Sequence, residues 1–203
     1  RFWCAPGVYS DASLKIVGIA VNDESITEQD QNGAGKPAWT RSGSTVRLTG
    51  DGPYVVTGSA TKSRLIADHD CTIAITDLSI DNEDATFSPI ECNGHFVTVQ
   101  LDGTNTLVGG SGDDGHSAIN ITYSSNLVIT NLSDGATLYA TGCGGGAGIG
   151  GNGLTHSGNI SIYGGTITAR GGTLRFTASG GAGIGGGSGG DWREIEIYGG
   201  TVI

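Results

Sequence analysis

The sequence is short of positive charge and of long hydrophobic runs, and each shortage excludes a class of protein. Only 10 of the 203 residues are Lys or Arg, against 20 Asp or Glu, which gives a formal net charge of −10. Because nucleic-acid binding requires clustered basic side chains, we expect no nucleic-acid partner. No stretch approaches the roughly 18 apolar residues of a membrane-spanning helix, so we expect no membrane span.

Cysteine is also scarce, and its spacing excludes the common metal and redox motifs. The four cysteines are Cys4, Cys71, Cys92 and Cys143, and no two of them form a C-x-x-C pair. An even number of cysteines in so polar a chain favours an oxidising compartment, so we expect an extracellular or cell-surface location.

Glycine is abundant, with 38 residues, and much of it lies in two similar copies. The stretch "GGGAGIGGNG" (Gly144–Gly153) recurs as "GGAGIGGGSG" (Gly180–Gly189). Each copy precedes an alternating run that ends in a Gly-Gly pair, "GNISIYGGTI" (Gly158–Ile167) and "REIEIYGGTV" (Arg193–Val202). The glycines follow no Gly-X-Y period, which excludes a collagen-like chain.

Apolar residues recur along the chain at a slowly lengthening spacing. Two series have parallel steps, of 27, 24, 30, 33 and 35 residues in the first and 24, 29, 30 and 35 in the second. Together with a looser third series they indicate three short strands in each repeat, which predicts a single-stranded parallel β-helix (a β-solenoid) of about six coils. The first series opens at Val46, Ile73, Val97, Leu127, Ile160 and Ile195, the second is Ile66, Ile90, Ile119, Ile149 and Ile184, and the third is Leu78, Leu107, Leu138, Ile167 and Val202.

This arrangement predicts which aliphatic side chains face the core. The glycine-rich copies would form one side of a coil, where glycine allows positive φ and close approach of neighbouring backbones. The side chains expected to be buried are Ile73, Ile75, Val97, Val99, Leu127, Ile129, Ile149, Ile160, Ile162 and Ile184. The alternative fold is an antiparallel β-sandwich, which would show hairpin signals at roughly 8–12-residue spacing instead.

Residues 1–44 do not share the repeat and include the polar run Asn22–Pro37. Because a solenoid must cover its first coil, we predict an N-terminal cap over residues 1–44 and a β-helix over 45–203. The strand pattern continues to Ile203, so we expect further coils beyond it or another subunit stacked on the open end, with self-association through the ends.

The predicted coils also bring two cysteines together. Cys71 and Cys92 lie two and five residues before Ile73 and Val97, near equivalent places on adjacent coils. A disulfide requires Cα atoms within roughly 7 Å, which adjacent coils allow. We therefore predict a Cys71–Cys92 disulfide and leave Cys4 and Cys143 unassigned.

The series "GAGIGG…IYGGTITARGG…GAGIGGG…IYGGTVI" (Gly146–Ile203) resembles the glycine-rich parallel β-helix repeats of large surface proteins from Gram-positive and gut bacteria. Those proteins are adhesins or carbohydrate-binding domains. The resemblance implies a non-catalytic extracellular module for adhesion, for polysaccharide or cell-surface glycan binding, or for a structural stalk. The shared residues are structural glycines and core aliphatics, so we carry over no catalytic residue and expect no enzyme.

The densest acidic motif, "GGSGDDGHS" (Gly109–Ser117), allows three interpretations. A surface turn is favoured, because Asp and Gly suit turns. A calcium contact through Asp113 and Asp114 is the second, since the motif begins like a calcium-binding nonapeptide repeat; the acidic run Asp81–Glu91 offers further oxygen ligands. The third is catalysis, because "DDGH" is similar to a polygalacturonase motif, although the Arg-x-Lys motif is missing. A calcium-dependent polysaccharide lyase or glycoside hydrolase is therefore the alternative function.

Aromatic residues provide the candidate sugar site. Alternation points Tyr163 and Tyr198 outward at equivalent positions of adjacent coils, about 4.8 Å apart. Exposed rings suit the apolar faces of sugars, so we predict carbohydrate binding by Tyr163, Tyr198 and Trp192. The alternative is a ladder in which the two tyrosines stabilise each other, by roughly 0.5–1.5 kcal/mol.

Overall fold

A computed structural model describes residues 14–17, 39–112, 114–174 and 179–203 of the chain. Every regular element in these ranges is a β-strand. Within them there is accordingly no helix long and apolar enough to cross a membrane. The all-β class is confirmed for the described part of the chain.

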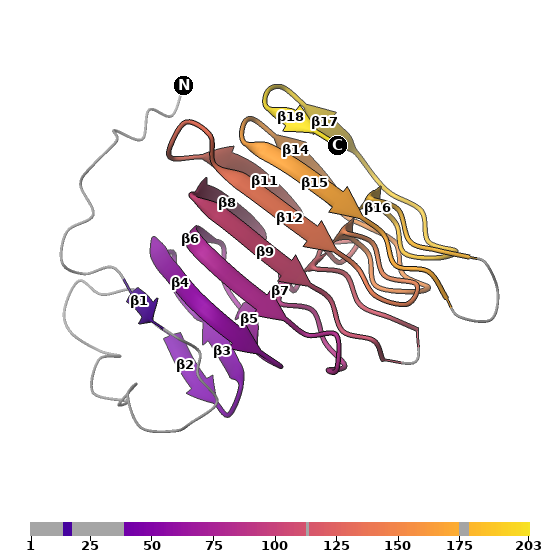
Figure 1. Cartoon of the computed structure of the whole chain (residues 1–203), viewed down its shortest axis with the longest axis horizontal. Helices are drawn as coiled ribbons and strands as arrows, with labels where there is room; N and C mark the ends of the chain where they lie inside the picture. Colours follow the sequence, from indigo (N-terminus) through magenta and orange to yellow (C-terminus); the bar gives the residue numbers. More distant parts are fainter. Residues whose placement is uncertain (1–13, 18–38, 113, 175–178) are drawn as a thin grey trace.

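The strands form two sheets, which Figure 1 shows running side by side from β4 at one end of the molecule to β18 at the other. The 11-stranded sheet contains β1 (Leu14–Val17), β4 (Tyr54–Thr61), β6 (Cys71–Asp81), β8 (Phe96–Asp102), β9 (Thr104–Val108), β11 (Asn126–Asn131), β12 (Thr137–Thr141), β14 (Asn159–Ile162), β15 (Thr166–Arg170), β17 (Ile195–Ile197) and β18 (Thr201–Val202). The 7-stranded sheet contains β2 (Trp39–Ser42), β3 (Thr45–Leu48), β5 (Arg64–Ala67), β7 (Ile90–Glu91), β10 (Ile119–Asn120), β13 (Ile149–Gly150) and β16 (Ile184–Gly185).

In both sheets, nearly all neighbouring strands are parallel and belong to successive repeats. Leu127 of β11, for example, lies opposite Val97 of β8 on one side and Ile160 of β14 on the other. The exceptions in the described residues are the antiparallel strand pair β2–β3 and an isolated antiparallel bridge between Thr173 and Gly180. This predominance of parallel pairs excludes the antiparallel β-sandwich.

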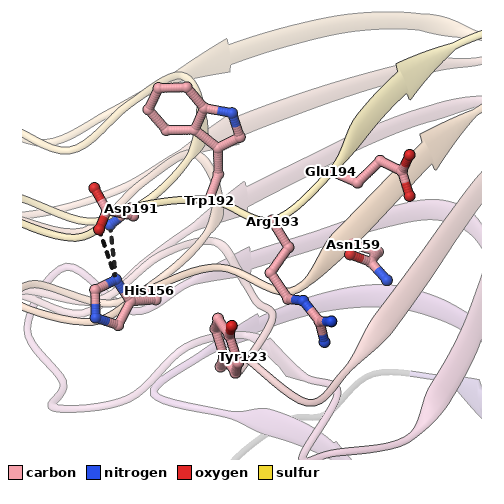
Figure 2. Close-up of a pocket in the computed structure, with 7 residues that line it drawn as sticks. All are labelled: Tyr123, His156, Asn159, Asp191, Trp192, Arg193 and Glu194. Atoms are coloured by element: carbon pink, nitrogen blue, oxygen red, sulfur yellow. Dashed lines mark hydrogen bonds and ion pairs between the residues drawn. The ribbon is translucent and has the colours of Figure 1, made fainter.

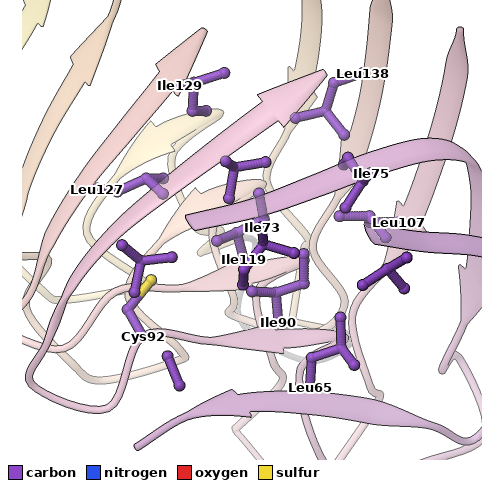
Figure 3. Close-up of a cluster of buried hydrophobic side chains, with 14 of the residues drawn as sticks. Leu65, Ile73, Ile75, Ile90, Cys92, Leu107, Ile119, Leu127, Ile129 and Leu138 are labelled. Carbon is purple, nitrogen blue, oxygen red and sulfur yellow. The ribbon is translucent and has the colours of Figure 1, made fainter. Parts of the chain in front are cut away.

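The core lies between the two sheets and is built from the alternate, inward-facing residues of each strand (Figure 3). Val97, Val99 and Leu101 of β8 are fully buried, whereas the residues between them are partly exposed. Full burial of one such side chain contributes about 1.5–3 kcal/mol. Nine of the ten aliphatic residues predicted to be buried are buried, and Ile184, on the edge strand β16, is half-buried.

The predicted single-stranded parallel β-helix of about six coils with an N-terminal cap is wrong. In that fold the three strands of each repeat belong to three separate sheets. Here the strands of the first and the third series belong to the same 11-stranded sheet, which is bent between them. Strand β6 joins them, because its residues 71–76 pair with β8 and its residues 79–81 pair with β9. The first repeat also departs from the expected order, since Val46 lies in the other sheet opposite Leu65. The described chain is therefore a two-sheet, all-strand fold with one antiparallel hairpin.

The bend in the larger sheet comes from one backbone corner that recurs in every repeat. Asp77 in the middle of β6 has φ of 48°, and the glycines at the same corner in other repeats also have positive φ, for example Gly103 at 61° and Gly165 at 88°. Left-handed backbone is tolerated by Gly and, among other residues, by Asp and Asn. The Asp77 carboxylate also accepts a hydrogen bond from the Thr104 N–H at 2.9 Å.

Of the predicted cap, the described part comprises β1, β2 and the turn at residues 43–44. Strand β1 pairs in parallel with β4, and the indole of Trp39 is buried in the core cluster. The polar run Asn22–Pro37 lies outside the described residues, as do Cys4 and Asp113.

Cys71 and Cys92 are buried free thiols in this structure, which therefore gives the predicted disulfide no support. Cys71 opens β6 in the larger sheet and lies opposite Val97. Cys92 follows β7 in the smaller sheet, where its N–H donates to the Asn120 carbonyl at 2.9 Å. The prediction required the two cysteines to occupy equivalent places of the repeat, and they do not.

We expect Cys71 and Cys92 to react with iodoacetamide only when the protein unfolds. Burial raises the pKa of the Cys71 thiol to about 12 and raises the pKa of Cys92 as well, so little reactive thiolate forms at neutral pH. The half-buried Cys143 is the internal comparison and should be labelled first, although burial raises its pKa too. Peptide mapping by mass spectrometry under non-reducing conditions measures this order. Recovery of a Cys71–Cys92 cross-linked peptide would contradict it.

Candidate binding pocket

Three loops on one side of the molecule stack on one another just before β11, β14 and β17. Backbone hydrogen bonds join the second loop to the third, from the Leu154 N–H to the Ser188 carbonyl at 3.0 Å and from the Ser157 N–H to the Asp191 carbonyl at 2.9 Å. Gly190 lies in the third loop, and a Cβ at this position would collide with the Thr155 carbonyl. The glycine thus permits the close approach that aligns the loops.

These loops border an open cavity of about 780 Å³, which we call the Trp192 pocket (Figure 2). Tyr123 comes from the first loop and His156 from the second, whereas the third contributes four consecutive residues. The lining residues are Tyr123, His156, Asn159, Asp191, Trp192, Arg193 and Glu194. Aromatic surface combined with a few converging polar groups is the usual composition of a ligand site.

Trp192 provides the largest apolar surface of the pocket. Its side chain is 62% exposed and stands at the rim in Figure 2. No ring or cation within the described part of the chain packs against this indole. More than half of the surface of this residue is therefore open to a ligand.

Arg193 extends over the ring of Tyr123. Its guanidinium carbon lies 4.8 Å from the ring centroid, a cation–π contact worth about 0.5–1 kcal/mol at an exposed site. Among the described residues no carboxylate lies within 4.0 Å of this guanidinium, and no hydrogen-bond acceptor engages it. Tyr123 thus orients the guanidinium while its N–H donors remain open to the pocket.

His156 holds the loop that carries Trp192. Its Nδ1 accepts a hydrogen bond from the Asp191 N–H at 2.9 Å, which requires the neutral imidazole with its proton on Nε2. The same Nδ1 lies 3.6 Å from the Asp191 carboxylate, a contact that becomes an ion pair only when the ring is protonated. The Tyr123 ring packs edge-on against the imidazole, with 6.1 Å between the two ring centroids.

Tyr163 and Tyr198 lie outside this pocket, and each directly follows the end of its strand, β14 and β17 respectively. Their ring centroids are 4.7 Å apart with an angle of 15° between the planes, and the side chains are 53% and 59% exposed, so the predicted outward position and spacing are confirmed. Each ring nevertheless covers one face of the other. A hydrogen bond to Glu196 also raises the pKa of Tyr198 to about 12. A sugar can therefore stack only on the two outer faces of the pair, which favours the ladder interpretation.

The two acidic segments predicted as calcium ligands follow the neighbouring strands β6 and β9, which end at the paired residues Asp81 and Val108. Asp113 is outside the described residues, and Asp114 is exposed, with its carbonyl accepting a hydrogen bond from the Gly145 N–H at 2.9 Å. Within the described ranges no three His, Cys, Asp or Glu side chains are placed to hold a metal ion. Calcium binding stays a prediction.

The sequence contained a signal for the Trp192 pocket that went unused. Tyr123, His156 and Asp191 follow one another at 33 and 35 residues, the same steps that separate Leu127, Ile160 and Ile195 in the strand series. Applying the repeat to the loops would have placed these three side chains together. The contact between Arg193 and Tyr123 has no such signal, because it depends on the direction in which a long side chain turns.

Comparisons of this chain with protein-family models, with curated proteins and with solved structures find no match. The resemblance of Gly146–Ile203 to surface-protein repeats therefore rests on its own residues. Functional inference starts from the pocket.

Proposed function

We propose that this chain is a non-catalytic extracellular module that binds polysaccharide, or a glycan on a cell surface, at the Trp192 pocket. The observation that carries the proposal is the exposed indole of Trp192 beside a cavity lined by polar side chains. Sugars present apolar C–H faces and a rim of hydroxyl groups. An indole face matches the former, and the Asn159 amide, the Asp191 and Glu194 carboxylates and the Arg193 guanidinium match the latter.

The surroundings of the carboxylates support binding without catalysis. Glycoside hydrolysis requires one carboxyl group to be kept protonated as a general acid, usually by an enclosed apolar environment. Asp191 and Glu194 are exposed to water, so they lack such an environment. Their carboxylates are suited to accept hydrogen bonds from sugar hydroxyls.

We assign Tyr163 and Tyr198 to a stabilising ladder and place the principal sugar contact at Trp192. Tyr198 directly follows β17 and lies four residues beyond Glu194, which corresponds to about 13 Å of extended chain. A long glycan bound at the pocket can reach the outer face of Tyr198, but it does not depend on this ring.

Trp192→Ala should weaken polysaccharide binding by at least about tenfold, because about 1.4 kcal/mol of stacking is lost. Retention on affinity gels against a panel of neutral and acidic polysaccharides, followed by titration calorimetry on those retained, measures the effect. The matched control is Tyr139→Ala on β12, an aromatic side chain that is 47% exposed and lies outside the pocket.

The double variant Tyr163→Ala and Tyr198→Ala should keep most of the binding if the tyrosines act as a ladder. If Trp192→Ala binds as tightly as the native protein, the binding site is not at Trp192. If no polysaccharide on the gels retains the protein, the role of a structural stalk is the hypothesis that remains. New reducing ends in the same incubations would instead show that the protein is an enzyme.

A further inference from the structure

The one arginine that lines the Trp192 pocket has no carboxylate partner among the described residues. The chain carries a net charge of −10 and only 10 Lys and Arg, yet no described carboxylate lies within 4.0 Å of Arg193. Asp191 and Glu194 are its near neighbours in sequence. The Asp191 carboxylate lies beside His156, and in Figure 2 the Glu194 side chain points away from the guanidinium.

A cation–π contact in the pocket restrains this guanidinium. The Tyr123 ring lies under it at 4.8 Å, and the Tyr123 ring is in turn packed against His156. The Asn159 amide is held on the same side of the pocket, because its Nδ2 donates to Asn126 Oδ1 at 2.8 Å. A guanidinium that is already oriented loses less conformational entropy when it forms hydrogen bonds with a ligand.

We propose that the Trp192 pocket recognises a sugar that carries a carboxylate, with Arg193 donating two parallel N–H hydrogen bonds to that group. This inference rests on the proposed function, since it names the class of glycan bound at the same site. The planar fork of arginine matches the planar carboxylate, and such paired hydrogen bonds are stronger than bonds between neutral groups. Trp192 stacks on the sugar ring, and the Asn159 Oδ1 is placed to accept from a hydroxyl.

The charge of the whole chain restricts the ligand further. A net charge of −10 repels a densely sulfated polymer over its whole length, whereas one carboxylate gains a short-range contact at Arg193. The ligand is therefore a uronate in a short or sparsely charged polysaccharide, or a sialic acid at the end of a cell-surface glycan, rather than a heavily sulfated chain.

Calorimetric titration with paired ligands tests the inference. One pair is an oligogalacturonate and its fully methyl-esterified form, and the other is a sialylated oligosaccharide and the same oligosaccharide without sialic acid. The native protein should bind the acidic member of one pair at least tenfold more tightly than the neutral member. The pair that shows this preference identifies the source of the carboxylate.

The variants Arg193→Gln and Arg193→Lys test whether Arg193 causes the preference for the acidic ligand. Arg193→Gln should bind both members of the pair with equal affinity, close to that of the native protein for the neutral one, whereas Arg193→Lys should keep part of the preference. Because Arg193 is exposed, a thermal melt of each variant should match the native protein.

Three results would overturn the inference. Equal affinity of the native protein for both members of each pair, with binding still lost in Trp192→Ala, leaves the proposed function intact and rejects the role of Arg193. A preference that survives in Arg193→Gln does the same. Absence of binding to all four ligands and to the polysaccharide panel rejects the proposed function together with the inference.

Discussion

Gly150→Ala should destabilise the protein strongly, whereas Gly43→Ala should destabilise it much less. Gly150 has φ of 143°, a conformation that is essentially restricted to glycine, and a Cβ there would collide with the carbonyl oxygen of Gly185 on the adjacent strand β16. Strain and collision together should cost at least about 4 kcal/mol, a large share of the 5–15 kcal/mol by which domains are usually stable.

Gly43 is the matched control for this substitution. It also has positive φ, at 56°, but a Cβ there meets no atom within 4 Å. The left-handed region costs an alanine only about 1–2 kcal/mol. Urea denaturation followed by circular dichroism compares the two midpoints, and equal losses in the two variants would show that the contact between β13 and β16 is not as tight as described.

Ile129→Ala should lower the stability of the protein by about 2–5 kcal/mol, because it removes a fully buried side chain and leaves a cavity. For a chain of this length the loss corresponds to a decrease in melting temperature of about 4–20 °C. Differential scanning calorimetry measures it directly.

Ile197→Ala is the control from the same column of residues. Parallel pairing places Val99, Ile129, Ile162 and Ile197 opposite one another on successive strands, but Ile197 lies on the edge strand β17 and is 54% exposed. Its substitution should change the stability by no more than about 0.5 kcal/mol. An Ile197→Ala variant as unstable as Ile129→Ala would mean that another copy or segment covers this edge in solution.

In the first strand series, the sequence by itself determined the parallel neighbours from Val97 onward. Val97, Leu127, Ile160 and Ile195 were aligned correctly from their spacing, because successive repeats must place an aliphatic residue on the core side of each strand. The outward position of Tyr163 and Tyr198 follows from the same alternation, since consecutive side chains of a strand point to opposite faces. These features depend only on local periodicity, which a single sequence displays.

Register in the earlier repeats could not be obtained in this way. Ile73 was aligned with Val97 but lies opposite Val99, and Leu107 was aligned with Leu138 but lies opposite Ala140. A shift of two residues keeps every aliphatic side chain on the core side, so the hydrophobic pattern does not distinguish the alternatives. Buried Asn105 fills the inward position beside Leu138, because its side chain bonds the Leu78 N–H at 3.0 Å and the Thr137 carbonyl at 3.2 Å.

Only the tertiary structure decided how many sheets the strands form, where the cysteines lie and which residues line the Trp192 pocket. The bend at Asp77 makes one sheet of two strand series, and it depends on a backbone angle that Asp adopts only in a suitable context. The pocket joins Tyr123 to Arg193, 70 residues apart, through a side chain whose direction is set by packing against the ring. Local periodicity therefore specifies which residues face inward, whereas long-range contacts specify where the corners, thiols and polar side chains meet.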